Sequence, residues 1–165
     1  SKIEVTVKEN TVDNYRVNEG EPVPDLHREA TGLKDAPITR HAHSTLFSPG
    51  FHNAVALFED KQGTNNGRTK YSPRILHFIT PETQYTSFYW WMFARDFSAP
   101  DKKLDQWYSD VTRKVFEEDK DAIEWIEFQW ANDDRPDFME NHVPSDKGAV
   151  KMRQIVHELA IQESN

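Results

Sequence analysis

The sequence predicts an α+β domain in which a curved antiparallel sheet wraps on helices. Three observations support this prediction. A chain of 165 residues is long enough to form one domain with a sizeable core, and hydrophobic residues make up 36% of it. The amino-terminal part consists of short apolar stretches separated by turn signals, as expected of strands. Toward the carboxyl end, two longer segments carry apolar residues at helical spacing, so helices follow the strands.

The amino-terminal strands are the least regular part of the prediction. Residues 3–7 alternate apolar and charged side chains, which is the period-2 pattern of a half-buried strand. A second, short strand is expected around Tyr15. The prolines and glycines that follow indicate irregular structure as far as Pro37.

Two antiparallel strand pairs are expected in the middle of the chain. Residues 38–47 and 51–60 flank a Ser-Pro-Gly turn signal. Residues 74–81 and 85–97 flank a second turn. The strands of this second pair are apolar on both faces along part of their length, so each face is expected to meet another layer.

Two helices are expected after the strands. Ser98 suits the N-cap of the first helix, with Pro100 in its first turn and Asp101 three residues after the cap. This helix is expected to run to about Ala131. A polar loop then leads to a second helix that begins near Asp146 and has an apolar side of its own.

A carboxylate interrupts the apolar stripe of the first helix. Apolar residues recur at steps of three and four along it, and Asp119 lies on that stripe, four residues after Val115 and three before Ala122. Burying an unpaired carboxylate is costly, so a buried Asp119 requires a cation, a metal or several hydrogen-bond donors. The alternatives are an exposed turn at this position, or an ion pair with a buried arginine such as Arg95 or Arg74.

Composition excludes several classes of protein. The net charge is −8 and the basic residues are scattered, so neither a nucleic-acid nor an anionic-membrane surface is expected. The chain has no cysteine, which excludes disulfides, cysteine-ligated zinc and an iron–sulfur cluster within it. The longest apolar run, residues 88–94, is far shorter than the ~20 residues that span a bilayer. We expect a cytoplasmic protein, and the missing initiator methionine indicates processing or a longer parent protein.

Two motifs carry a resemblance to a known family. Residues 77–83 read HFITPET, and residues 118–120 read EDK within the helical segment VFEEDKDAIEWIE. Residues 47–63, FSPGFHNAVALFEDKQG, follow the same pattern more loosely. From about Thr39 to the carboxyl terminus, the chain resembles the catalytic domain of the Rieske non-heme iron oxygenases of the vanillate O-demethylase and dicamba monooxygenase type.

The resemblance implies a helix-grip fold, similar to START and Bet v1 domains, as a single domain over residues 1–165. Its sheet would pack on the long C-terminal helix and on a closing helix. The implied catalytic candidates are Asp119, as the carboxylate ligand of a mononuclear non-heme Fe(II), and His77, which matches a substrate-binding position in the pocket. His52 falls near another pocket position, and Trp90, from the aromatic stretch, is a further candidate to contact substrate.

The implied activity is that of a monooxygenase that hydroxylates or O-demethylates a small aromatic compound. This chain departs from the family pattern in two respects that bear on this activity. The chain has seven histidines, but none forms the helical pair that supplies the other two iron ligands in the family. The Rieske cluster is missing as well, because it requires cysteines. We therefore expect the chain to be inactive alone and to work with a missing amino-terminal half or with a separate Rieske-bearing chain, in a homo-oligomer like its relatives.

Other interpretations remain open. The chain is alternatively a metal-free helix-grip module that binds a small hydrophobic ligand, or an auxiliary subunit of a split oxygenase. A metal site built on His41 and His43 is a further alternative, since residues two apart on a strand point to the same side.

Overall fold

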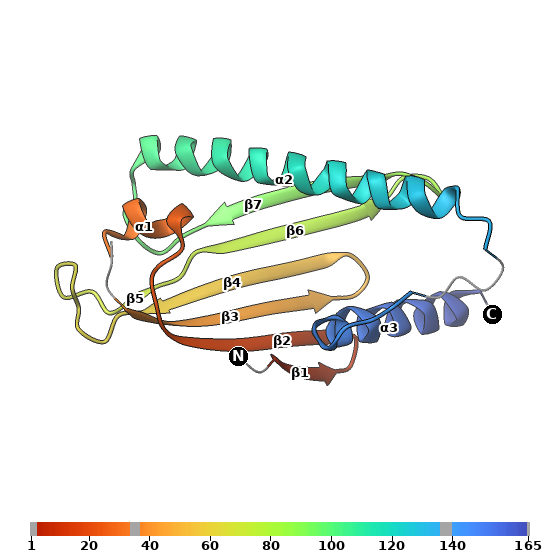
Figure 1. The fold of residues 1–165 in the computed structure, drawn as a ribbon, viewed down its shortest axis with the longest axis horizontal. Coiled ribbons are helices and arrows are strands. Elements are labelled where there is room, and N and C mark those ends of the chain that lie inside the picture. Colours follow the sequence, from red (N-terminus) through yellow and green to blue (C-terminus); the bar gives the residue numbers. More distant parts are fainter. Residues whose placement is uncertain (1–2, 34–36, 136–139, 165) are drawn as a thin grey trace. The chain divides into compact units, whose positions relative to one another are not determined.

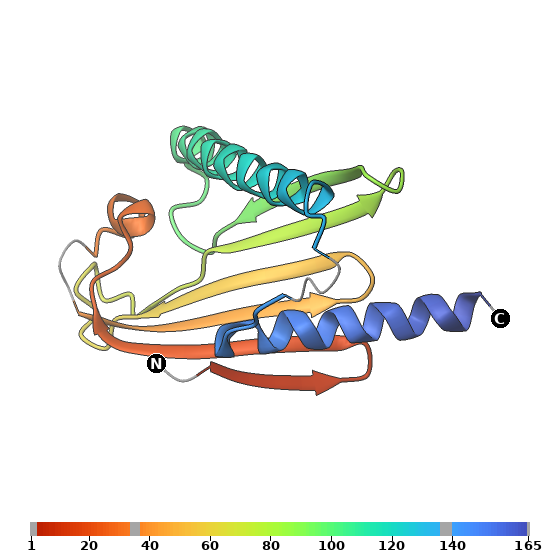
Figure 2. The same ribbon diagram turned by 45° about the vertical axis from the view of Figure 1, so that its right-hand side comes forward.

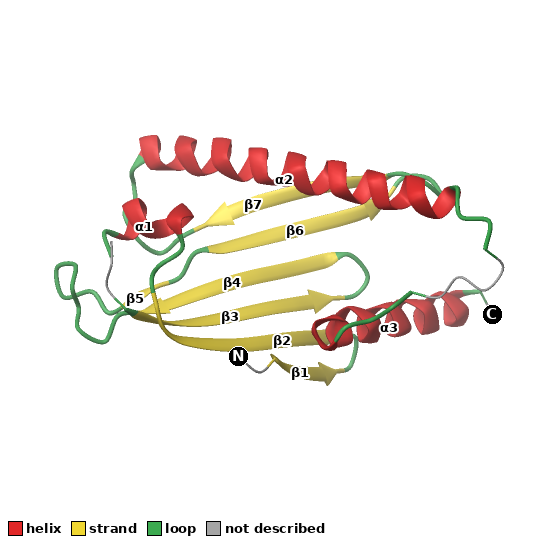
Figure 3. Cartoon of the chain, viewed as in Figure 1, coloured by secondary structure: helices red, strands yellow, loops and turns green. Residues whose placement is uncertain are grey.

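The computed structural model describes residues 3–33, 37–135 and 140–164. Strands come first and the longer helices follow, which confirms the α+β class (Figure 3). The chain divides into two compact units, which are described separately below. The first comprises Ser1–Ala99 together with Val143–Asn165, and the second is Pro100–His142.

The first unit is built on a seven-stranded antiparallel sheet. The strand order is β1-β2-β3-β4-β6-β7, and the short β5 pairs with β4 (Figure 1). The strands are β1 Ile3–Lys8, β2 Thr11–Glu21, β3 Ile38–Phe47, β4 Phe51–Glu59, β5 Lys70–Tyr71, β6 Arg74–Pro81 and β7 Ser87–Ala94. Both hairpins predicted in the middle of the chain are therefore confirmed, β3 with β4 and β6 with β7.

The turn between β3 and β4 also fixes the neighbouring strand. Gly50 follows the cis bond between Ser48 and Pro49. The backbone N–H of Ile79, in β6, donates to the carbonyl oxygen of Gly50 at 2.8 Å. A Cβ on Gly50 would lie 2.1 Å from the carbonyl oxygen of Ile79, so this close approach between turn and strand requires glycine.

Two elements between residues 11 and 37 differ from the sequence prediction. The strand expected around Tyr15 is long, since β2 runs for eleven residues. A helix, α1 Asp25–Thr31, replaces part of the expected irregular structure; Pro24 precedes it and Gly32, at φ +68°, closes it. Prolines here start a helix instead of preventing one, because the first turn does not use its backbone N–H groups.

The first unit is completed by α3 Lys147–Glu163, which follows a 3₁₀ turn at Pro144–Asp146. The helix begins close to the predicted Asp146. It lies beside β1 and β2 (Figures 1 and 2). A Cβ on Gly148 would lie 1.9 Å from Oδ1 of Asn14 in β2, so the helix backbone approaches the strand closely at this point.

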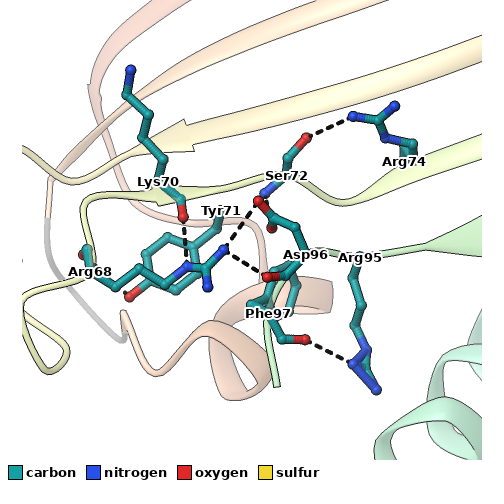
Figure 4. Close-up of polar contacts among 8 residues, drawn as sticks. All are labelled: Arg68, Lys70, Tyr71, Ser72, Arg74, Arg95, Asp96 and Phe97. Carbon is teal, nitrogen blue, oxygen red and sulfur yellow. Dashed lines mark hydrogen bonds and ion pairs between the residues drawn. The ribbon is translucent and has the colours of Figure 1, made fainter. Parts of the chain in front are cut away.

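The core of the first unit lies around β4, β5 and the end of β7. Its fully buried apolar side chains are Val12, Val23, Leu33, Ile38, Phe58, Tyr71 and Phe97. Arg68 links two parts of this region: its Nε donates to the carbonyl oxygen of Lys70 at 2.7 Å, and its guanidinium pairs with Asp96 at 3.1 Å (Figure 4). The Asp96 carboxylate also accepts from the backbone N–H of Ser72 at 2.7 Å. These contacts hold the segment before β6 against the end of β7.

The second unit consists mainly of α2 Lys102–Ala131. Its end agrees with the prediction, but its N-cap does not. Asp101 is the cap, accepting from the backbone N–H groups of Lys103 at 3.0 Å and Leu104 at 3.1 Å. Ser98 lies outside the helix at φ +51°, because the aspartate offers a charged acceptor closer to the first turn. None of the helices in residues 3–33, 37–135 and 140–164 is both long and apolar enough to cross a membrane.

Candidate functional site

A cavity of about 360 Å³ lies on one face of the sheet. Its floor is a straight cross-strand row from β2 to β7, in which Asn14 pairs with Ser44, Ser44 with Ala54, Ala54 with Ile75 and Ile75 with Phe93. All residues that line the cavity belong to the unit built on Ser1–Ala99. The volume is within the range of small-molecule sites.

The lining combines small apolar residues with positive charge. Alanines and larger apolar side chains form most of the surface, namely Ile3, Ala42, Ala54, Ala56, Ile75 and Phe93. Arg16 and Arg40 lie on the same face, Arg16 two positions along β2 and Arg40 four positions along β3 from the floor row, and Arg74 lines the cavity as well. The lining includes no aspartate and no glutamate. The cavity is therefore suited to a ligand with an apolar body.

Two histidines form a second row beside the cavity. His52 in β4 pairs directly with His77 in β6, and their rings stack with centroids 4.7 Å apart. Ser44 Oγ lies 2.9 Å from Nε2 of His52, and the hydroxyl of Tyr89 lies 2.6 Å from Nδ1 of His77. Burial lowers the pKa of His52, so this ring is neutral near pH 7. The two stacked imidazoles thus connect Ser44, at the cavity floor, with Tyr89 in β7.

A third histidine, which sequence reasoning missed, lines the cavity from α1. His27 is buried, with its ring centroid 5.2 Å from that of Phe58 and 6.3 Å from that of Phe93. Burial, and secondarily the positive charge of Arg40, lowers the pKa of His27 to about 4. A neutral imidazole next to a guanidinium is therefore the state near pH 7. No sequence signal marked His27, because α1 itself was not predicted.

The structure brings His52 and His77 together but sets Trp90 apart from them. Trp90 pairs with Phe78, so its side chain lies on the face of the sheet opposite to His77. On that face Phe47, Phe51 and Phe78 stack in a row, with successive centroids 5.2 and 5.0 Å apart. Neither Trp90 nor the two histidines His52 and His77 are among the residues that line the cavity; the histidines lie beside it, on the face of its floor row.

The side chains of His41 and His43 point to the face opposite the floor row, although His43 is among the residues that line the cavity. Nδ1 of His41 lies 2.7 Å from the hydroxyl of Tyr15, and Nδ1 of His43 lies 3.3 Å from the carboxylate of Asp13. Both histidines thus have hydrogen-bonding neighbours. Within the described ranges, no group of three or more His, Cys, Asp or Glu side chains is placed to hold a metal ion.

Asp119 lies on α2, in the second unit, on the helix face shared by Val115 and Ile123. The two arginines considered as its partners belong to the first unit. There, Arg95 donates to the carbonyl oxygen of Phe97 at 2.9 Å, and Arg74 to Oγ of Ser72 at 3.5 Å (Figure 4). A carboxylate is a ligand type that iron accepts, but Asp119 is exposed, and among the described residues it belongs to no group of three or more His, Cys, Asp or Glu side chains that could hold a metal ion. Among the residues that the structure describes, Asp119 is therefore not part of a complete iron site.

The fold and the cavity define a class, the α+β domains with a cavity on one face of an antiparallel sheet. Comparison with known proteins gives the family. The model of the vanillate O-demethylase oxygenase C-terminal domain matches residues 1–162, and the chain belongs to this family. No curated protein sequence matches the chain significantly.

Solved structures of dicamba monooxygenase share the fold. The structure bound to 3,6-dichlorosalicylic acid aligns with a TM-score of 0.86 at 20% identity, covering 99% of this chain and 48% of that one. The apo structure aligns with a TM-score of 0.83 at 20% identity, covering 99% and 50%. The structure with non-heme iron and dicamba aligns with a TM-score of 0.79 at 19% identity, covering 99% and 50%. The chain thus spans about half the length of these proteins.

Proposed function

We propose that this chain is the catalytic-domain portion of a Rieske-type non-heme iron monooxygenase that hydroxylates or O-demethylates a small aromatic compound. The family match over residues 1–162 carries the proposal. The cavity supports it, because its volume and its apolar lining suit a single substituted ring. The solved relatives with dicamba and with 3,6-dichlorosalicylic acid bind compounds of this kind.

In this proposal the substrate lies in the cavity, and His77 orients it. His77 is held in place by the hydroxyl of Tyr89 and by the stacked ring of His52. A ring held by these two contacts is ordered before the substrate binds, which lowers the ordering cost of binding. Trp90 takes no part, since its side chain lies on the other face of the sheet.

Asp119 supplies the carboxylate ligand of the iron in this proposal. It is the residue within the EDK motif, and it lies on the helix face shared by Val115 and Ile123. In such sites iron with open coordination positions activates dioxygen. The remaining protein ligands and the Rieske cluster must come from outside this chain, from the rest of a longer protein or from a partner chain.

A second candidate is a metal-free binding module. The observation in its favour is that the cavity is lined entirely within the unit built on Ser1–Ala99, without Asp119. Binding that is independent of Asp119, with no turnover under any condition, would favour this candidate. An auxiliary subunit of a split oxygenase would instead copurify with a Rieske-bearing chain.

The test uses the full-length protein that contains this chain, or the chain with its Rieske-bearing partner. Product from an aromatic methyl ether is followed as released formaldehyde under reductant and oxygen. We expect turnover with the wild type, none with Asp119→Asn, and undiminished turnover with Asp121→Asn, which removes a carboxylate from another side of α2. Equal turnover in the two variants would refute the role of Asp119, and the isolated chain is expected to give no product.

A further inference from the structure

The most informative unexplained group in the cavity is Arg40. Its Nε atom is buried and has no hydrogen-bond partner among the residues that the structure describes. A buried N–H group is normally hydrogen-bonded, because removing it from water without a partner is costly. The charge of Arg40 acts on His27, which is neutral near pH 7 and so supplies no negative charge.

A second arginine lies next to it on the same face. Arg16 in β2 pairs with Ala42, two residues beyond Arg40 on β3, so the two arginines occupy diagonal positions across adjacent strands. Long side chains at diagonal positions are close enough to contact the same ligand. Neither arginine forms an ion pair with a carboxylate among the described residues of its own unit.

The charge of these two arginines is not balanced within the cavity, because no acidic residue lines it. The chain holds 28 acidic and 20 basic residues, so a surface chosen without regard to charge would include carboxylates. The cavity lining has none. Two like charges without a counter-ion raise the local potential, and a concave, low-dielectric wall strengthens it. The cavity is therefore an attractive site for an anion.

We infer that Arg40, with Arg16 beside it, binds the anionic group of a small carboxylate ligand at the end of the cavity farthest from His77. The carboxylate accepts from the Arg40 guanidinium, and the apolar body of the ligand covers Ala42 and Ala54. The opposite end of the ligand then faces Ser44 and the histidine row. Guanidinium groups suit this role, because their planar donors match both oxygens of a carboxylate.

The strand geometry sets the orientation. Along β3, Arg40, Ala42 and Ser44 follow one another on the cavity face, and Ser44 contacts His52. Arg40 and Ser44 are four residues apart on the strand, which corresponds to about 13 Å. A single substituted ring fits this span with its charge at one end and its other substituents at the other. The inference rests on the proposed function only in calling this ligand the substrate; the binding preference itself requires neither iron nor turnover.

The test compares two probes of the same shape, benzoate and the neutral benzamide, by calorimetric titration of the chain at constant ionic strength. We expect benzoate to bind at least about tenfold more tightly than benzamide, as charge-assisted hydrogen bonds provide. Arg40→Gln is expected to abolish this preference. Arg40→Lys keeps the positive charge and should retain part of the preference for benzoate. Lys61→Gln, which removes one positive charge from an exposed loop position, should leave the preference unchanged.

Several results would overturn the inference. They are equal affinity of the wild type for the two probes, no binding of either, or an undiminished benzoate preference in Arg40→Gln. If Arg40→Gln fails to fold, Arg40→Lys and the comparison of the two probes on the wild type still test the inference. A second readout is the ¹⁵N signal of the Arg40 Nε–H group, which should shift on addition of benzoate and not of benzamide. Loss of turnover in the Asp119 variant leaves these outcomes unaffected, so failure of the proposed function and failure of this inference are distinguishable.

Discussion

Replacing His27 should remove a specific part of the acid sensitivity of this fold. The pKa of His27 is lowered from 6.5 to about 4, first by burial and then by the charge of Arg40. In the unfolded chain the imidazole takes up a proton as the pH falls through 6.5, whereas in the folded chain it stays neutral until about pH 4. The unfolded state therefore binds more protons in this window, and the free energy of unfolding decreases as the pH falls.

The size of the effect follows from the two pKa values. Each unit of difference corresponds to about 1.36 kcal/mol, so the whole difference corresponds to about 3 kcal/mol at low pH. Between pH 7 and pH 5 the share attributable to His27 is about 2 kcal/mol, because the unfolded imidazole becomes almost fully protonated over that range while the folded one does not. This is a large part of the stability of an ordinary domain.

Urea unfolding at several pH values measures this contribution. The wild type should lose about 2 kcal/mol more than His27→Gln between pH 7 and pH 5, since glutamine does not titrate. His157→Gln, at an exposed position of α3, serves as the control and should show the wild-type pH dependence. If His27→Gln kept the full pH dependence of the wild type, the assignment of a neutral, buried imidazole would be wrong.

Three further predictions concern packing, loop structure and the far face of the sheet. Gly148→Ala should destabilise the chain by about 1–3 kcal/mol in urea unfolding, because the new Cβ displaces the amide of Asn14; alanine at an unobstructed helix position would stabilise it instead. Burial acts to raise the pKa of Asp60, but hydrogen bonds from Thr64 and nearby backbone groups outweigh it and lower that pKa. Asp60→Asn should weaken these hydrogen bonds at a cost of about 1–3 kcal/mol and so lower the midpoint of urea unfolding. A midpoint like that of the wild type would contradict this expectation. Trp90→Ala should leave the affinity for benzoate in calorimetric titration unchanged, and a tenfold loss would show that the face opposite the cavity takes part in binding.

The regular elements were predictable where one physical signal dominated. A Ser-Pro-Gly turn between two apolar stretches identified the hairpin of β3 and β4, and apolar steps of three and four identified α2 to its last residue. β2 was underestimated for a reason tied to the cavity. Its side chains on the cavity face include Asn14 and Arg16, which are polar, so the alternation that marks a half-buried strand is weak there.

The candidate site was only partly predictable. His77 and His52 were singled out from motifs, and the cross-strand register, which no local pattern encodes, makes them direct neighbours. The same register separates Trp90 from them, because a shift of one residue along a strand reverses the side chain. Arg40 and His27 escaped notice altogether: one is an ordinary charged residue in the sequence, and the other lies on a helix of seven residues whose pattern is too short to read.

The position of α3 has a consequence for synthesis of the chain. The helix that packs on β1 and β2 follows them in the chain only after the whole of α2, so these strands leave the ribosome long before their covering helix exists. Through this interval β1 is an edge strand with open backbone groups and an uncovered neighbour, a state that favours pairing with other chains. The charged residues of β1, Glu4 and Lys8, then act as gatekeepers against association of nascent chains.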